Sequence, residues 1–335
     1  AQQGMRSYDN YGGASSPPPE VNEVLHIDKY QQRPIRDPVF QVGGLMGGQH
    51  LRGGQQEGIR QRQFKFSSLN TNSEEGMRQF LMSPCPRKAG TIQCCITRKK
   101  SGINKLFPEY RLYMKNPDDD RDIFLMVGKK RGGQKTSNYL ISMDENDLRR
   151  SSTNYLGKLR ANFVGTEFRI YDNGVNPDGA EGTEDVTSGQ ARRELAVVMY
   201  EANVMGSKGP RRMQVAIPRV DSASNEAVVF QPSQEKDGMM AKFKNKDVDD
   251  LTVAFNKPPR WNEQVGAFVL NFNGRVTMAS VKNFQLTTQE APDNILLQFG
   301  RISKDEFTMD LEYPITPFQA FTITLSSFDS KIACD

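Results

Sequence analysis

The sequence predicts a mainly β protein, either a sandwich or a barrel, and two observations support this. From about Phe80 onward, short runs rich in Val, Ile, Phe, Tyr and Thr alternate with Gly, Asn, Asp and Pro. Many short strands separated by turn residues are typical of sandwich and barrel folds. In addition, Asn173-Gly174 and Asn273-Gly274 are pairs that tolerate positive φ at hairpin turns.

Each predicted strand is a short run of strand-forming residues bounded by turn formers. In chain order they are Thr91–Arg98, Tyr110–Lys115, Asp122–Lys129, Asn138–Ser142, Gly157–Val164, Glu167–Tyr171, Glu194–Glu201, Met213–Pro218, Ala227–Phe230, Phe268–Asn271, Asn283–Leu286, Ile295–Ile302 and Glu306–Tyr313. The segment 318–328 is ambiguous, because it alternates in places like a strand but is apolar in nearly every direction when wound as a helix. A helix of that kind must be surrounded by protein.

The first part of the chain has a different composition. Residues 1–75 contain 10 Gly, 10 Gln and 5 Pro, with few apolar residues at a regular period. Such a segment buries too little to offset its chain entropy. We therefore predict a disordered leader over 1–78 and a folded domain over 79–335. Within the leader, 20–29 has helical spacing of Val and Leu, which indicates either a transient helix or one that folds on a partner.

Composition narrows the possible functions. No apolar run approaches the length of a membrane helix, so we expect a soluble protein. The two histidines, His26 and His50, lie in the predicted leader. Without a histidine in the folded part, Ser-His and Cys-His nucleophile pairs and most zinc sites are excluded there. The acidic cluster at 118–122 lies between two predicted strands, which favours a solvated turn over catalysis.

The four cysteines, Cys85, Cys94, Cys95 and Cys334, form no CxxC pair. Neighbours on a strand point to opposite faces, so Cys94 and Cys95 are poorly placed to share a metal. We expect reduced, structural thiols in a cytosolic protein. The composition thus predicts a protein that is not an enzyme and that needs no cofactor or metal.

Positive charge is concentrated in one region. From Arg98 to Arg160 there are 15 Lys or Arg against 8 Asp or Glu, a local charge of +7 within a chain whose net charge is +4. Such a concentration indicates an anionic partner: a membrane surface, a polyphosphate or a nucleic acid. If 157–164 is extended, Lys158, Arg160 and Asn162 leave one face, and Leu159, Ala161 and Phe163 leave the other. The first face would then be a cationic claw and the second would be core.

Several motifs resemble those of the Tubby family. Residues 272–285 read FNGRVTMASVKNFQ and 320–335 read AFTITLSSFDSKIACD, and the likeness continues upstream through KTSNYLIS at 135–142, GKLR at 157–160, YDNGVNP at 171–177 and GPR at 209–211. It covers roughly residues 80–335, with mild departures at Asn273, Thr322 and Asp335. The resemblance implies a closed twelve-strand barrel around a hydrophobic C-terminal helix. On that helix, the Thr322 hydroxyl should bond back to a preceding carbonyl.

The resemblance also implies a phosphatidylinositol 4,5-bisphosphate site. Matching the motifs places the phosphoinositide-binding residues at Asn138, Lys158, Arg160 and Arg192, with adjacent Arg193 as the alternative to the last. Lys and Arg two residues apart on a strand stand roughly 6.5 to 7 Å from one another, which suits two phosphates on neighbouring ring carbons. We expect an accessory basic surface at Lys129, Lys130, Arg131 and Lys135.

Family resemblance further implies a monomeric adaptor at the inner face of the plasma membrane. Such an adaptor would couple membrane receptors to intraflagellar transport machinery, with roles in the cilium and the nucleus. One alternative is a DNA-binding transcription modulator, although no recognition helix or base-stacking platform is visible and we expect no nucleic-acid partner. The other is a purely structural interaction domain whose basic face is incidental.

Overall fold

The computed structural model describes residues 73–100, 107–116, 119, 121–177, 190–201, 212–263 and 267–329. Most of the predicted leader, including the possible helix at 20–29, lies outside the described residues. Within the described part, no helix is long and apolar enough to cross a membrane.

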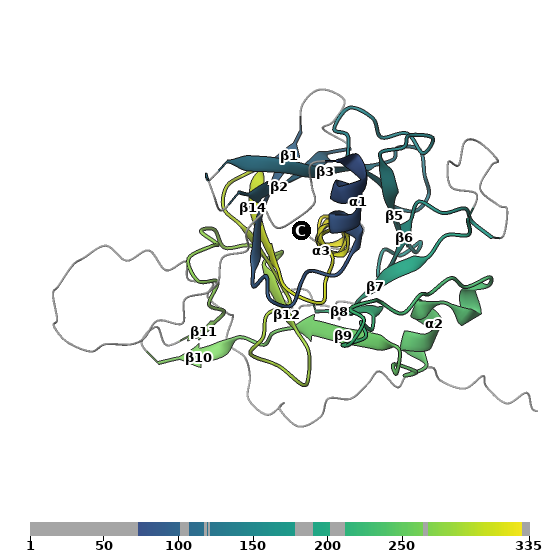
Figure 1. Ribbon diagram of the computed structural model, residues 1–335. Coiled ribbons are helices and arrows are strands. Elements are labelled where there is room, and N and C mark those ends of the chain that lie inside the picture. The colour runs from purple at the N-terminus through teal and green to yellow at the C-terminus, as the bar shows by residue number, and fades with distance from the viewer. Residues whose placement is uncertain are drawn as a thin grey trace, which may run out of the picture. The chain divides into compact units, whose positions relative to one another are not determined.

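Twelve strands close into one antiparallel barrel (Figure 1), so of the two predicted architectures the barrel is confirmed. Around the barrel they follow the order β1-β14-β13-β12-β9-β8-β7-β6-β5-β4-β3-β2. Their bounds are β1 Ile92–Lys99, β2 Glu109–Lys115, β3 Asp122–Lys130, β4 Asn138–Ser142, β5 Tyr155–Ala161, β6 Glu167–Asp172, β7 Glu194–Tyr200, β8 Met213–Pro218, β9 Leu251–Asn256, β12 Phe284–Thr287, β13 Leu297–Arg301 and β14 Glu306–Leu311. A separate two-stranded sheet pairs β10 (Arg260–Asn262) with β11 (Ala267–Val269).

The ambiguous C-terminal segment is a helix, α3 (Pro317–Ser327), and every residue of it is buried. Thr316 and Gln319 form a capping box at its start, and Pro317 occupies the first turn, where its missing N–H costs nothing. Two wall glycines make room for the helix. A Cβ at Gly128 would lie 2.7 Å from Leu325 Cδ1, and one at Gly157 would lie 2.8 Å from Phe318 Cζ.

The prediction for Thr322 is confirmed. Its hydroxyl donates to the Phe318 carbonyl at 2.7 Å and lies 3.0 Å from that of Gln319, so a fully buried polar atom is satisfied inside its own helix. Thr322 therefore needs no partner from the barrel wall, whereas the Ser326 hydroxyl also lies 2.8 Å from that of Tyr200 on β7.

A second helix, α1 (Glu74–Met82), packs against α3. Ser73 caps it, and its residues Phe80 and Leu81 are buried in the same core as the barrel interior. Arg78 donates to the carbonyls of Tyr155 and Thr153 on the wall. The folded part thus begins before the predicted boundary at 79, because the polar first turn of α1 lacks the apolar density that marks a domain start.

Two further segments cover parts of the outer wall. The 3₁₀ helix η3 (Glu235–Asp237) leads into α2 (Met239–Lys244), whose Met239, Met240 and Phe243 form a second core with residues of β7, β8 and β9. On another part of the wall, Arg275 forks onto Asp310 with bonds of 3.0 and 2.6 Å. Arg275 therefore holds the motif at 272–285 against β14.

The predicted turn at Asn273-Gly274 is confirmed, with φ of 51° and 75°. The same prediction for Asn173-Gly174 is wrong, because neither residue has positive φ. Predicted strand 227–230 makes only isolated bridges, whereas β9 and β10 were not predicted. The sequence pattern does not predict β9, because its short apolar run lies between acidic residues and a Lys-Pro-Pro segment.

Adjacent positions on α3 test whether the helix is the core of the barrel. Phe321 and Thr322 are both fully buried. Phe321→Ala leaves a large cavity and should cost about 3–5 kcal/mol of unfolding free energy. Thr322→Ala removes one methyl and a hydroxyl bonded within its helix, so it should cost about 1 kcal/mol. Urea unfolding measures both, and equal costs would contradict a core built around this helix.

Candidate functional site

Two rows of side chains cross the outer wall on β4, β5 and β6. In the first row, Asn138 faces Arg160, and Arg160 faces Arg169. In the second row, Leu140 faces Lys158, and Lys158 faces Tyr171. Directly opposed side chains have Cβ atoms about 4.5–5.5 Å apart. Strand pairing thus makes Asn138 and Arg160, which lie far apart in sequence, immediate neighbours.

The face alternation predicted for β5 holds within the strand. Leu159 and Ala161 belong to the core, so Lys158 and Arg160 leave the opposite face. The predicted protruding claw needs correction, however. Lys158 is only 3% exposed and Arg160 is half-buried, because neighbouring side chains and segments cover this wall.

β5 also ends at Ala161, earlier than predicted, so Asn162 and Phe163 belong to the turn that follows. Asn162 accepts hydrogen bonds from the backbone N–H groups of Gly165, Thr166 and Glu167. Phe163, predicted to enter the core, is 73% exposed instead.

The Tyr171 ring lies close to two of the predicted cations, Lys158 and Arg192. The Arg192 guanidinium carbon is 4.1 Å from its centroid, and Lys158 Nζ is 5.9 Å away. Both distances allow cation–π attraction. Burial raises the pKa of Tyr171 to about 12, so the phenol stays neutral. One aromatic side chain thus brings Lys158 and Arg192 into a single cluster, although they come from different elements.

The backbone beside Arg192 is held in place by the YDNGVNP motif. The Asp172 carboxylate accepts from the N–H groups of Gly174 and Arg193, at 3.0 and 2.9 Å. The Val175 carbonyl accepts a hydrogen bond from the Arg192 N–H at 2.8 Å. Gly174 is required by this close approach, because a Cβ there would lie 2.6 Å from the Arg192 backbone nitrogen. Most of the motif therefore positions Arg192 rather than contacting a ligand.

Arg192 and Arg193 have different environments. The Arg193 side chain pairs with Asp172 at 2.7 Å, which engages its charge. The Arg192 guanidinium lies on Tyr171, and its Nη1 is enclosed without a hydrogen-bond partner among the described residues. A buried donor of this kind calls for an acceptor. Of the two candidate arginines, Arg192 is therefore the better placed for an anion.

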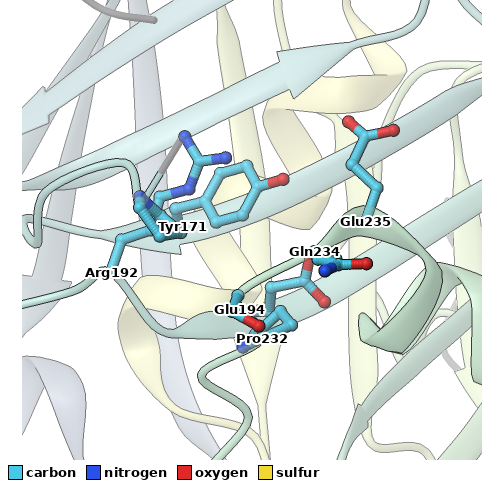
Figure 2. Close-up of a pocket in the computed structure, with 8 residues that line it drawn as sticks. Tyr171, Arg192, Glu194, Pro232, Gln234 and Glu235 are labelled. Atoms are coloured by element: carbon cyan, nitrogen blue, oxygen red, sulfur yellow. The ribbon is translucent and has the colours of Figure 1, made fainter. Parts of the chain in front are cut away.

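A small hollow opens beside this cluster, about 290 Å³ including the space open to solvent. In Figure 2, Tyr171 and Arg192 form one side of it, and Glu194, Pro232, Gln234 and Glu235 lie on the other. The Glu194 carboxylate accepts the Met239 N–H at 2.5 Å. Burial raises the pKa of Glu194, against the opposing effects of that hydrogen bond and of Arg169 and Arg192.

The predicted accessory basic residues separate into two groups. Lys129 lies 4.0 Å from Glu109, and Lys130 lies 3.5 Å from the buried Asp329 and near the Tyr139 ring. Lys130 therefore helps to close the barrel around the end of α3. Arg131 and Lys135 lie exposed in the turn between β3 and β4.

The cysteines are placed as strand alternation predicts. Cys94 is buried in the core, while Cys95 lies on the other face and is half-buried. Burial raises the pKa of Cys85 to about 12 and that of Cys94 well above its usual value. Both thiols are thus held in the neutral, unreactive form. In the described ranges, no group of three metal-ligating side chains comes together.

Sequence reasoning did not single out Tyr171, Arg169 or Glu194 as members of this cluster. Tyr171 is the first residue of the motif at 171–177, and Glu194 follows the candidate Arg193, yet a motif does not reveal which side chains meet across strands. The strand register supplies that information: it joins Arg160 to Arg169, and Lys158 to Tyr171.

The fold and the cluster together define a closed β-barrel that encloses a helix and carries a cationic cluster on its outer wall. The family model described as Tub family matches residues 81–330, and the chain belongs to that family. It is 47% identical over 262 residues to Tubby-related protein 3 of Mus musculus, covering 78% of this chain and 56% of the relative.

Two further relatives carry Tubby names. Identity is 47% over 259 residues with Tubby-related protein 1 of Homo sapiens, covering 77% of this chain and 46% of the relative. Protein king tubby of Drosophila pseudoobscura pseudoobscura is 39% identical over 330 residues, covering 95% of this chain and 68% of the relative. The chain spans about half the length of the first two relatives.

The positioning role of Gly174 can be tested without any ligand. Gly174→Ala should push the Arg192 backbone away from Val175 and Asp172. Amide exchange at Arg192 and Arg193 should then become at least about tenfold faster, because both N–H groups lose their acceptors. Hydrogen exchange read by NMR measures this, with the barrel strands as internal reference. Unchanged exchange at both residues would contradict the role.

Glu194 makes a pH-dependent contribution to stability. Its raised pKa favours the protonated form in the folded state, so the stabilisation is full below its usual value of 4.5 and is lost as pH rises through the folded-state pKa. The unfolding free energy of Glu194→Gln minus that of the natural protein should therefore increase as the pH rises from about 4 to about 7. Urea unfolding at both pH values gives the difference. A constant difference, or one of opposite sign, would refute the assignment.

Proposed function

We propose that the protein is a non-enzymatic phosphoinositide-binding adaptor, which attaches to phosphatidylinositol 4,5-bisphosphate at the inner face of the plasma membrane. Asn138, Lys158, Arg160 and Arg192 would form the headgroup site. The observation that carries this proposal is their convergence on one part of the outer wall, through the register of β4, β5 and β6 and the shared Tyr171 ring.

Chemical differences among the four residues suit a headgroup with two phosphates. Arg160 and Arg192 can each fork onto one phosphate, and Lys158 is a compact charge between them. The Asn138 amide can donate to a further oxygen. The unpartnered Arg192 Nη1 supports this reading, since its bonding capacity is unused within the described part of the protein.

Burial of Lys158 affects how a ligand would engage. Because Lys158 is 3% exposed whereas Arg160 and Arg192 are half-buried, we expect a phosphate to meet Arg160 and Arg192 first. Contact with Lys158 would then require the side chains that cover it to move. The buried ammonium would interact strongly with a phosphate, since water screens it little.

Wider function follows from such an attachment. A single headgroup site supported by exposed Arg131 and Lys135 would give a modest, reversible anchor, since each basic residue near an anionic leaflet contributes about 1 kcal/mol. An adaptor held in this way would couple membrane receptors to transport machinery, including that of the cilium. Hydrolysis of the lipid would release it toward the nucleus, because the differential affinity for the membrane is then lost.

Liposome flotation tests the site. We expect vesicles with phosphatidylinositol 4,5-bisphosphate to recruit the protein better than vesicles of equal charge made with phosphatidylserine. Arg160→Gln combined with Lys158→Met should reduce recruitment at least about tenfold, since each lost charge-assisted contact is worth about 2 kcal/mol. Arg219→Gln is the control for the single change Arg160→Gln, because it also removes one positive charge, at a site where Arg219 pairs with Asp250.

Unfolding temperatures of all variants check that the fold is kept. Equal recruitment by both lipids would refute a stereospecific headgroup site.

The main rival function is a DNA-binding transcription modulator, which would use the same basic region. It would show affinity for duplex DNA that falls steeply with salt and ignores the positions of the inositol phosphates.

A further inference from the structure

The turn between β5 and β6 presents an unusual pair of side chains. Phe163 is 73% exposed and Val164 is 64% exposed, and no large hydrophobic side chain whose exposure the structure describes exceeds the value of Phe163. Two adjacent, strongly exposed apolar side chains at a turn are costly in water, and they commonly mark an interaction surface. The turn directly follows Arg160 and Ala161.

Hydrogen bonds within the turn hold its backbone on both sides of the exposed pair. Asn162 Oδ1 accepts from the N–H groups of Gly165, Thr166 and Glu167, at 2.7, 2.9 and 3.2 Å. The Asn162 N–H donates to the Glu167 carbonyl at 2.8 Å. These four paired N–H groups lower the cost of moving the turn out of water.

Charges near the turn indicate its partner. Arg160 lies just before it, and the Ala161 N–H donates to Ser137 at the end of the β3–β4 turn, which carries exposed Arg131 and Lys135. The acidic side chain at the start of β6, Glu167, pairs with Lys244 at 2.7 Å. An apolar tip beside basic residues, two of them exposed, complements the surface of an anionic bilayer, where headgroups overlie acyl chains.

We propose that Phe163 and Val164 form a wedge that inserts into the acyl-chain boundary of an anionic membrane while the neighbouring cluster holds a phosphorylated headgroup. This inference rests on the proposed function and deepens it. Affinity for the intact lipid in a bilayer would then exceed affinity for the soluble headgroup, because only the bilayer receives the wedge.

The chain offers a closely matched control. Val229 is 64% exposed, the same fraction as Val164. It follows β8, whereas the wedge follows β5. Because successive strands from β5 to β8 are antiparallel, the two residues lie at opposite ends of the barrel. Val229→Ser and Val164→Ser therefore make the same chemical change at the two ends.

Two binding measurements separate the wedge from the headgroup site. Phe163→Ser with Val164→Ser should weaken binding to vesicles with phosphatidylinositol 4,5-bisphosphate by about tenfold or more. Calorimetric binding of soluble inositol 1,4,5-trisphosphate should remain unchanged, and Val229→Ser should alter neither. If the double variant binds vesicles as tightly as Val229→Ser, the wedge is refuted, whereas a natural protein that does not bind the soluble headgroup refutes the headgroup site.

A second experiment measures directly whether residue 163 enters the acyl-chain region of the bilayer. In a Trp261→Phe background, the fluorescence of Phe163→Trp should be quenched by lipids brominated on their acyl chains, and that of Val229→Trp should not. The same measurement on phosphatidylserine vesicles tests insertion of the wedge even if the proposed headgroup site is refuted. Absence of quenching would overturn the inference, as would concentration-dependent dimers that Phe163→Ser abolishes, since the tip would then be a protein interface.

Discussion

Burial of α3 inside the closed barrel is the interaction on which the rest of the structure depends. Twelve strands enclose a lumen too wide for their own side chains to fill, and the helix supplies the missing apolar volume. Gly128 and Gly157 bring the wall close to it. Gly157 also immediately precedes Lys158, so the strand that carries the proposed headgroup site is fixed by its contact with the helix on the opposite face.

The wall serves two purposes on its two faces. Inward residues such as Leu159 set the register of β5 against its neighbours, and this register determines which outward residues meet. Asp172 and Gly174 then bring Arg192 onto the same face from outside the barrel strands. Cationic side chains would repel one another if left to themselves. Here the packing of the core and the shared Tyr171 ring hold them together, which leaves the cluster ready for an anion.

Much of the strand content could be predicted, because period-two alternation and turn residues are local signals, whereas other features needed information from outside the segment. For 318–328, only the family resemblance chose helix over strand, since the alternation of its apolar residues suits either. Alternation assigned Lys158 to the outer face, but outer does not mean exposed where other segments pack on the wall. Phe163 was placed in the core because the sequence does not mark the residue at which β5 ends.

The order of elements along the chain has a consequence for synthesis. Since α3 follows every barrel strand, the ribosome delivers the centre of the domain after its wall. Strands that emerge earlier expose an apolar inner face until the helix is synthesised, and such exposed surface makes a nascent chain prone to aggregation. A premature stop just after β14 would keep the proposed lipid-contacting residues in the sequence. The truncated chain would nevertheless lack the helix that fills the barrel, and so could not hold those residues in place.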